Sequence, residues 1–470
     1  MYCGYVTNLK NVRPHPNADR LVLADCFINT VCVAKDNYTE GQLGVYFPVD
    51  GQLSMEFCQA NGLLAVYENG VNVSGGYMDP EKRNVKAIKL RGEKSDGLFL
   101  PLTCLEYTGA DLSTFKPGDQ ITKVKGKEIC TKYIPKTKAA PPMQKNMKIK
   151  KQKVKVKYQA TPTFFEHKDT EQLAYNLDAF KPGDEVEITL KMHGTSQRTG
   201  HHKVHIGYKK SILDRILRSP GTPIYDWGQA NGTRRTLLKT FEGGFYGSNE
   251  FREPHAKMFE GKLWKGETVY YEVVGFTHTG APIMATCSNK KLNDKEFIKQ
   301  YGEETVFSYG CDPSGKKMMY GEDDEGTFGI EVEVPQSDIY VYRMTMTNED
   351  GDTVEYTPDF MRYRCELMGV KCVPVLWSGK IPQNPASKDD PTISAGEWIK
   401  NVAERYYDGP DPIGKTHIRE GVVVRIINRP VFAAYKHKNF EFKVLEGIIK
   451  ESADAPDMEE ADGLDQEVVE

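Results

Sequence analysis

The sequence predicts an α+β protein with a small N-terminal β-barrel followed by a larger domain built on antiparallel sheets. Two observations carry this prediction. Residues 1–120 consist of short β-branched segments separated by turn residues, whereas residues 161–450 mix longer alternating segments with stretches of helical spacing. A chain of 470 residues is long enough for two or three separate hydrophobic cores.

The overall composition is that of an ordinary soluble protein, with 39% hydrophobic and 27% charged residues. The net charge of -4 indicates by itself neither a nucleic-acid partner nor a membrane partner. Ten cysteines are scattered without a CxxC pair, which is typical of reduced thiols in a cytoplasmic protein. The chain has no signal-peptide pattern and no apolar run of about 18 residues, so we expect a soluble protein.

The N-terminal 120 residues predict a series of short strands. The segment LVLADCFINTVCVAK, Leu21 to Lys35, alternates and is rich in β-branched residues, and Asp50-Gly51 is a hairpin signal. Several short strands without long amphipathic helices indicate a small barrel. The heptapeptide HPNADRL, His15 to Leu21, resembles a segment of the tRNA-binding OB modules attached to aminoacyl-tRNA synthetases. We therefore predict an OB-like nucleic-acid-binding domain at 1–120; the alternative is that HPNADRL forms only a turn.

Two charged segments offset each other within the near-neutral total. Thirteen lysines and one acid, Glu128, lie between Lys123 and Lys157, whereas residues 451–470 contain nine acids and no Lys or Arg. Such compositions argue against a packed core, so we predict a lysine-rich linker at 121–160 and a disordered acidic tail. The linker is either a solvated tether or a contact to a nucleic-acid backbone, and such a contact would be salt-sensitive and independent of base sequence.

The region 161–450 combines strands with two helices. The stretch EVEITLKM places Val186, Ile188 and Leu190 on one face of a half-buried strand. The segments TVYYEVVGF, DIYVYRMTMT and GVVVRIINRP predict three further strands, and PDFMRYRCELMGV and SAGEWIKNVAERYY have helical spacing. These elements predict an α+β domain on antiparallel sheets.

Charged residues occur within four apolar stretches of this domain. The stretches are Lys191-Met192-His193-Gly194, Tyr271-Glu272-Val273-Val274-Gly275, Glu420-Gly421-Val422-Val423-Val424-Arg425 and Phe440-Glu441-Phe442-Lys443, the last taken as an aromatic-flanked strand. A charge on a buried strand is costly unless it is paired or bound to a ligand. Two lysines and two glutamates on four such strands could neutralise one another around a triphosphate and a divalent metal ion.

This ordered set resembles the covalent nucleotidyltransferase superfamily of ATP-dependent ligases and mRNA-capping enzymes. The KxHG form of the first stretch is similar to RNA ligases, as is the lead-in segment with Asp169-Thr170-Glu171-Gln172. The N-terminal OB-like domain fits the RNA-ligase branch that seals nicks with 3′-OH and 5′-phosphate ends. DNA ligases and capping enzymes carry their OB domain after the fourth stretch, whereas only 27 residues follow Lys443 here.

The resemblance implies that Lys191 is a nucleophile and that the reaction uses ATP with Mg²⁺ or Mn²⁺. The amine of Lys191 would attack the α-phosphate and form a lysine–AMP phosphoramidate. This attack requires a neutral amine, although the pKa of a free lysine is about 10.4. A second cation and a bound metal ion, in a site that excludes water, could lower that pKa. Lys443 fits the second cation, which would also bind the α-phosphate.

The resemblance assigns nucleotide-binding roles to further residues of these stretches. His193 and Gly194 complete the motif of the nucleophile. Glu420 would bind the metal ion, and Glu272 would accept the ribose hydroxyl groups. Tyr342, in the segment IYVYRMT, would stack on adenine.

RNA is the partner that the resemblance implies, as a nicked duplex or a folded molecule. Arg234, in the segment NGTRRT, fits a contact to the 5′-phosphate end, and Arg198 is its rival. The OB-like domain and the lysine-rich segment would hold the RNA across the break. No protein partner and no membrane partner is implied.

Some departures from the family pattern leave alternatives open. Glu441 occupies the first of the two lysine positions that the fourth motif often has, so Lys436 or Lys438 could compensate. Arg343 follows the aromatic residue where many relatives have an acid, so Tyr340 is an alternative to Tyr342.

The prediction from the sequence is an ATP-dependent RNA ligase that works through lysyl-AMP and an adenylylated RNA 5′ end. One alternative is an inactive nucleic-acid-binding protein, and another is a DNA ligase or guanylyltransferase of the same superfamily. The complete set of Lys191, Glu272, Glu420 and Lys443 argues against an inactive protein. The KxHG form and the order of the domains disfavour the other two enzymes.

Overall fold

The chain divides into two compact units, which are described separately here. The first unit comprises Met1–Lys136 and Lys438–Ala453, and the second comprises Thr137–His437 and Asp454–Glu470. The computed structural model describes residues 2–69, 71–134, 161–217, 219, 221–242, 249–323, 326–385 and 393–451. Helices and antiparallel sheets occur together, which confirms the α+β prediction. The predicted linker from residue 135 onward and the predicted tail after Glu451 lie outside the described residues.

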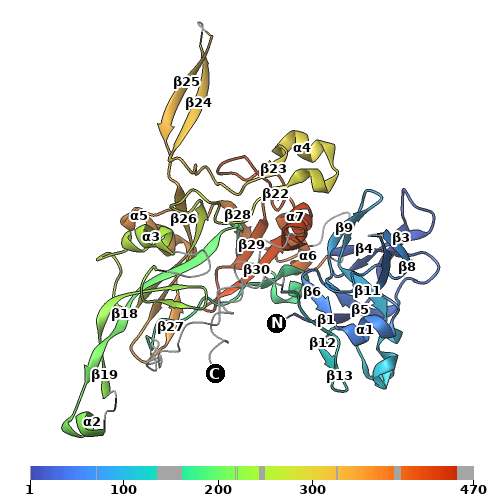
Figure 1. Ribbon diagram of the computed structural model, residues 1–470, viewed down its shortest axis with the longest axis horizontal. Coiled ribbons are helices and arrows are strands. Elements are labelled where there is room, and N and C mark those ends of the chain that lie inside the picture. Colours follow the sequence, from blue (N-terminus) through green and yellow to red (C-terminus); the bar gives the residue numbers. More distant parts are fainter. Residues whose placement is uncertain are drawn as a thin grey trace, which may run out of the picture. The chain divides into compact units, whose positions relative to one another are not determined.

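The first unit consists of short strands around one small core (Figure 1). One sheet has the order β11-β5-β1-β12, and a second has the order β2-β3-β4. The elements are β1 (Gly4–Asn8), β2 (Lys10–Pro14), β3 (Leu21–Cys26), β4 (Asn29–Ala34), β5 (Leu43–Phe47), β6 (Gly51–Leu53), α1 (Met55–Ala60), β7 (Ala65–Glu68), β8 (Val71–Gly75), β9 (Ala87–Leu90), β10 (Glu93–Asp96), β11 (Leu98–Pro101), β12 (Gln120–Ile121), β13 (Lys123–Val124), β14 (Lys127–Glu128), β15 (Cys130–Lys132) and α7 (Phe440–Glu451). The core includes Val6, Val45, Phe47 and Phe57.

The strands expected in Leu21–Lys35 are present, whereas the expected hairpin at Asp50-Gly51 is not. β3 and β4 pair with Leu21 opposite Ala34, which confirms the predicted strands in Leu21–Lys35. The hairpin expected at Asp50-Gly51 is wrong, because β5 pairs with β1 and β11 whereas β6 pairs with β15. Asp50 does adopt a turn conformation with φ 70°, but the chain uses this turn to pass from one sheet to another.

Residues 121–134, predicted as the beginning of the linker, are folded into the first unit. They form part of β12 and all of β13, β14 and β15, and Ile121, Val124, Ile129 and Cys130 join its core. The lysines of this segment alternate with the apolar residues and remain largely exposed. The segment thus has one apolar face, which its high lysine content conceals in the sequence.

The second unit contains two larger sheets. The five-stranded sheet has the order β16-β30-β29-β17-β28, and the six-stranded sheet has the order β20-β19-β18-β21-β26-β27. Their strands are β16 (Glu171–Gln172), β17 (Glu185–Leu190), β18 (Thr195–Lys209), β19 (Thr222–Thr233), β20 (Leu237–Leu238), β21 (Glu267–Gly275), β26 (Ser337–Thr347), β27 (Thr353–Glu355), β28 (Val375–Lys380), β29 (Gly421–Ile426) and β30 (Ala433–Lys438). As the alternation predicts, Val186, Ile188 and Leu190 of β17 are buried.

Both helices that the sequence predicts for this unit are present, each with a side-chain N-cap. Thr357 caps α5 (Pro358–Met368), and Ser394 with Glu397 forms a capping box for α6 (Ala395–Glu404). The remaining helices and strands are α2 (Ile212–Leu217), α3 (Glu253–Lys257), β22 (Cys287–Ser288), α4 (Lys295–Tyr301), β23 (Glu304–Thr305), β24 (Lys316–Asp323) and β25 (Gly326–Glu333). Ile399, Val402 and Ala403 of α6 pack on the five-stranded sheet.

Two hairpins extend from the second unit (Figure 1). The distal part of β18 pairs only with β19, and α2 lies at the end of this arm. β24 and β25 form a separate hairpin of eight paired positions. None of the described helices has the length and apolar character needed to span a membrane.

Candidate active site

The predicted nucleophile lies in the turn that connects the two sheets of the second unit. β17 ends at Leu190 in the five-stranded sheet, and β18 begins at Thr195 in the six-stranded sheet. The N–H of Lys191 donates to the carbonyl oxygen of Gly421 at 3.0 Å, which ties the beginning of the turn to β29. A side chain at Gly194 would contact the backbone of Val273 and lie 2.8 Å from Val274 Cγ1, so this close approach of the chains requires glycine.

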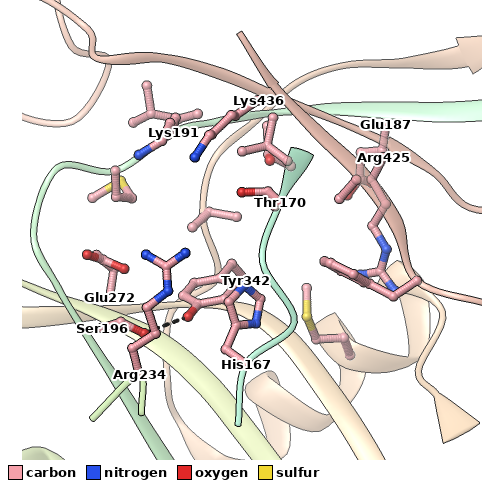
Figure 2. Close-up of a pocket in the computed structure, with 18 of the residues that line it drawn as sticks. His167, Thr170, Glu187, Lys191, Ser196, Arg234, Glu272, Tyr342, Arg425 and Lys436 are labelled. Carbon is pink, nitrogen blue, oxygen red and sulfur yellow. Dashed lines mark hydrogen bonds between the residues drawn. The ribbon is translucent and has the colours of Figure 1, made fainter. Parts of the chain in front are cut away.

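A cavity that is partly open to solvent lies beside this turn. Figure 2 shows the side chains that line it, and they come from both sheets. The five-stranded sheet contributes residues of β17, β29 and β30, and the six-stranded sheet contributes Ser196, Glu272 and Tyr342. A concave site with a few converging polar and charged groups is typical of small-molecule and cofactor sites.

Lys191 and Glu420 form an ion pair at the edge of this cavity. Lys191 Nζ lies 2.6 Å from Glu420 Oε1, and the Glu420 side chain is only 2% exposed. Glu420 immediately precedes β29, whose neighbour in the sheet is β17, so strand pairing brings the two residues together. His193 Nδ1 lies 3.5 Å from the other carboxylate oxygen, Glu420 Oε2. The structure therefore brings three of the predicted site residues into direct contact.

Tyr342 lines the cavity because β26 contains a bulge at this residue. Tyr270 pairs with Arg343 and Tyr271 pairs with Val341, so Tyr342 is an extra residue in its strand. A bulge changes the direction of a side chain, and such bulges are common beside active sites. The Tyr342 hydroxyl group lies 2.9 Å from Ser196 Oγ, the dashed line in Figure 2. Tyr340 is buried and does not line the cavity.

Glu272 lies in the middle of β21 and also lines the cavity. It is opposite Ser196 of β18 and Tyr340 of β26 in the sheet, and 7% of its surface is exposed. An acid inside an otherwise apolar strand was the sequence signal for this residue. The structure places it among the cavity residues together with Lys191 and Tyr342.

The second lysine of the cavity is Lys436, which the sequence had suggested as a possible substitute in the fourth motif. Figure 2 shows the amino groups of Lys191 and Lys436 directed into the cavity from the same side. Lys443 instead belongs to the first unit, where its Nζ lies 2.5 Å from Asp96 Oδ2. Of the two lysines named as possible substitutes, Lys436 lines the cavity, whereas Lys438 binds Glu446 at 2.8 Å.

The helix α7 explains why the reading of Phe440–Lys443 as a strand is wrong. The side chain of Asn439 accepts the N–H of Phe442 at 3.1 Å, which is the contact of a helix N-cap. This cap ends β30 and starts α7, so Lys443 lies in the helix. Glu441 of the same helix pairs with Lys89 at 3.1 Å and with Lys94 at 3.9 Å, both within the first unit.

The two predicted phosphate-binding arginines have different environments. Arg234 lines the cavity and donates to Asp169 Oδ1 from Nη2 at 2.8 Å. Partial burial acts to raise the pKa of Asp169, but the hydrogen bond and charge of Arg234 lower it overall. Arg198 is 2% exposed and donates to the carbonyl oxygens of Thr233 and Arg234, and it does not appear among the residues that line the cavity.

Sequence reasoning missed the group of residues at the other end of the cavity. Arg425 and Glu187 appear there in Figure 2, and Arg362 Nη1 pairs with Glu187 Oε2 at 2.7 Å. His167, which was also missed, lies beside Tyr342 with ring centres 5.0 Å apart. The guanidinium group of Arg425 also lies 5.3 Å from the centre of the Phe432 ring. Burial lowers the pKa of Arg425. The sequence signal for Arg425 was a cation within the apolar strand GVVVRI, just as Glu420 is an acid immediately before this strand.

Two comparisons with known proteins agree with this architecture. The model of an OB-fold domain family matches residues 4–102, within the first unit. No curated protein matches the chain in sequence. Solved structures of RNA ligases match along nearly the whole chain, and their low sequence identity means that the likeness concerns the fold. The chain thus shares its overall fold with these RNA ligase structures, and the OB-fold family model matches its N-terminal part.

The matching structures include several forms of the RNA ligase of Naegleria gruberi. A variant of that ligase with ATP and Mn is 14% identical, with a TM-score of 0.50, and the match covers 94% of this chain and 98% of that chain. A second variant with ATP and Mn is 14% identical, with a TM-score of 0.51 and coverage of 95% and 99%. The Naegleria ligase with PPi is 15% identical, with a TM-score of 0.50 and coverage of 94% and 98%.

Proposed function

We propose that the protein is an ATP-dependent RNA ligase that seals breaks with 3′-OH and 5′-phosphate ends. The observation that carries this proposal is the Lys191–Glu420 pair at the edge of a cavity that also contains Lys436, Glu272 and Tyr342. The fold of the chain and the ATP, Mn and PPi in the matching ligase structures support it.

In the first step, the amine of Lys191 attacks the α-phosphorus of ATP. The new N–P bond forms as the bond to the bridging oxygen breaks, and pyrophosphate leaves with the electron pair. Lys191 must release a proton to solvent before this attack. The Glu420 carboxylate at 2.6 Å favours the charged amine, so a divalent cation that takes up this carboxylate, together with the positive charge of Lys436, would favour the neutral form. Lys436 also stabilises the negative charge that develops on the α-phosphate. Tyr342 stacks on adenine and Glu272 accepts the ribose hydroxyl groups, as the resemblance implied.

The second and third steps transfer AMP and then release it. An oxygen of the RNA 5′-phosphate attacks the phosphorus of lysyl-AMP, which forms a pyrophosphate-linked RNA end and returns the amine of Lys191. The 3′-hydroxyl group of the other end then attacks the 5′-phosphate, and AMP leaves with the bridging oxygen. Arg234 lines the cavity and is the candidate to orient the 5′-phosphate, since Arg198 is buried.

The residues present fit a divalent cation that is shared with the nucleotide. No group of three or more His, Cys, Asp or Glu side chains among the described residues could hold a metal ion by itself. Mg²⁺ is commonly bound by one or two carboxylates together with substrate phosphates, and Mn²⁺ accepts the same oxygen ligands. Glu420 is such a carboxylate and would hold the ion against the phosphates of ATP. The ion would neutralise part of the phosphate charge.

The proposal is tested by following transfer of the α-phosphate to the protein. Purified protein is incubated with α-labelled ATP or GTP and Mg²⁺ or Mn²⁺, and labelled protein is measured on a denaturing gel. We expect label from ATP that is absent in Lys191→Ala, followed by sealing of a nicked RNA duplex. Label from GTP alone would favour guanylyl transfer, and sealing of DNA nicks in preference to RNA would favour a DNA ligase. No label from either nucleotide would favour a nucleic-acid-binding protein.

A further inference from the structure

A buried tyrosine outside the four predicted stretches holds the turn of the predicted nucleophile. The N–H of His193 donates to the hydroxyl oxygen of Tyr309 at 2.7 Å. His193 is two residues after Lys191, and Tyr309 is 2% exposed and does not line the cavity. The turn is therefore anchored at two backbone groups: the N–H of Lys191 binds Gly421, and the N–H of His193 binds Tyr309.

The backbone of Tyr309 has a conformation that is unfavourable for a bulky residue. Its φ is 48°, in the left-handed region, and Gly310 follows with a φ of 82°. Such a conformation persists only where the surroundings determine it, and it is most common at functional sites. Here the neighbouring chain packs closely, because a Cβ atom at Gly414 would lie 2.8 Å from the backbone nitrogen of Gly310.

The ring of Tyr309 also packs against the buried residue His417. Its centre lies 4.6 Å from that of His417, with the two rings at 79°. His417 is fully buried and follows a tight turn in which the Asp411 carboxylate accepts three backbone N–H groups. His417 is three residues before Glu420, the predicted metal-binding acid. The ring of Tyr309 therefore packs against the segment that leads to this residue.

The imidazole ring of His193 packs against the segment that also binds its backbone N–H. Phe307, two residues before Tyr309, packs edge-on against it with ring centres 4.5 Å apart. Phe307 also contacts His417, with ring centres 5.2 Å apart. The segment from Phe307 to Tyr309 therefore contacts both the backbone and the side chain of His193. The same two aromatic rings also pack against His417.

We propose that Tyr309 is a positioning residue for the transfer of AMP to Lys191, through the hydrogen bond from the N–H of His193. This inference rests on the proposed function. Removal of the hydroxyl group would leave a buried N–H without its acceptor, so the turn would relax toward another partner. A displacement of about 1 Å in a reacting group can slow a reaction about 100-fold.

The experiment compares Tyr309→Phe with a matched control, Tyr356→Phe. Tyr356 is also buried, but its hydroxyl group donates to Glu267 at 3.2 Å and it does not line the cavity. At saturating ATP, we expect single-turnover formation of lysyl-AMP to be about 10- to 100-fold slower in Tyr309→Phe. The KM for ATP should change less than about threefold. Sealing of a pre-adenylylated RNA nick, which does not use attack by Lys191, should also change less than about threefold.

Two results of this comparison would overturn the inference. One is a rate of lysyl-AMP formation in Tyr309→Phe equal to that of the wild type. The other is an equal loss in lysyl-AMP formation and in sealing of the pre-adenylylated nick, because a general loss of structure would affect both steps.

A second measurement does not depend on activity. Hydrogen exchange in the peptide that contains residues 191–194 should be at least about tenfold faster in Tyr309→Phe and unchanged in Tyr356→Phe, because exchange reports opening of the hydrogen bond. Unchanged exchange in Tyr309→Phe would refute the anchoring of the turn. If the wild-type protein took no label from ATP, the proposed function would fail, whereas the exchange result would still decide whether Tyr309 holds this turn.

Discussion

Two lysine–carboxylate pairs, one in each unit, have nearly the same geometry. Lys191 and Glu420 of the second unit are 2.6 Å apart, and Lys443 and Asp96 of the first unit are 2.5 Å apart. Both lysine side chains are 14% exposed. The difference lies in the surroundings, because Lys191 lines the cavity of the second unit, whereas Lys443 lies on the helix α7 of the first unit. Access to a ligand, and not ion-pair geometry, distinguishes the candidate reactive lysine from the structural one.

The strongest test of this comparison is to replace one lysine in each unit, Lys436 in the second and Lys443 in the first. We expect Lys436→Ala to slow lysyl-AMP formation by about 100- to 1000-fold, because the charge on the α-phosphate loses its stabilising cation. Lys443→Ala should stay within about threefold of the wild type. Single-turnover labelling with α-labelled ATP measures both rates. An equal loss in Lys443→Ala would restore the role that the sequence predicted for it.

Acid should destabilise the second unit through its buried histidines. Burial lowers the pKa of His202 and of His255 to about 4, from an ordinary value near 6.5. Because the unfolded chain binds these protons more tightly, stability is lost as the pH falls from about 6.5 toward 4. The loss is about 2 kcal/mol for each residue between pH 7 and pH 5.

This acid sensitivity can be measured for the second unit alone, because all four tryptophans (Trp227, Trp264, Trp377 and Trp398) lie in it. Urea unfolding followed by tryptophan fluorescence at pH 7 and pH 5 gives the free-energy difference. His202→Gln should reduce that difference by about half, since one of the two titrating groups is removed. An undiminished difference would show that other groups cause the acid sensitivity.

The Lys443–Asp96 pair should matter for stability rather than for catalysis. We expect Lys443→Ala to cost about 1 to 2 kcal/mol, because the pair is mostly buried and Asp96 would lose its partner. Hydrogen exchange in the peptide 440–451 should report this loss as easier opening of α7. Lys89→Ala is the control, since the Lys89 side chain is 30% exposed and pairs with Glu441 of the same helix. A double-mutant cycle with Asp96→Ala that shows no coupling would contradict the assignment.

The smallest effect concerns the two tyrosines of β26. Tyr342→Leu should raise the KM for ATP about tenfold, which corresponds to the loss of about 1.4 kcal/mol of stacking on the base. Tyr340→Leu removes a buried ring that does not line the cavity, so it should lower stability and change the KM for ATP less than about twofold. Equal KM values for the two variants would mean that Tyr342 does not contact adenine.

Much of the fold and part of the site could be predicted from the sequence. The alternation of apolar and polar residues around Val186 and Ile188 predicted the strand β17. Because this strand ends at Leu190, Lys191 begins the turn that follows it. Glu272 and Glu420 were recognisable because each interrupts or precedes an apolar strand, where an unpaired charge is costly. These features are local, so they can be read from a few neighbouring residues.

Other features depend on tertiary contacts and could not be predicted. The position of Tyr342 depends on a bulge, which is a property of the pairing between β21 and β26. The phenylalanines at 440 and 442 alternate as in a strand, but the Asn439 cap directs the chain into a helix. Arg198 belongs to the buried part of β18, and its guanidinium group donates to a backbone carbonyl oxygen within the protein, which the sequence alone does not indicate.

The turn from Lys191 to Gly194 also limits how the cavity walls can move. It joins a strand of one sheet to a strand of the other, and four residues span at most about 14 Å even when fully extended. The turn therefore limits how far the two sheets can separate at this edge. The other end is tied as well, because Arg425 Nη2 of β29 donates to the carbonyl oxygen of Tyr356 at 3.0 Å and lies 3.9 Å from Glu355 Oε2 of β27. The walls on both sides of the candidate nucleophile are thus held together by covalent and polar links between the sheets.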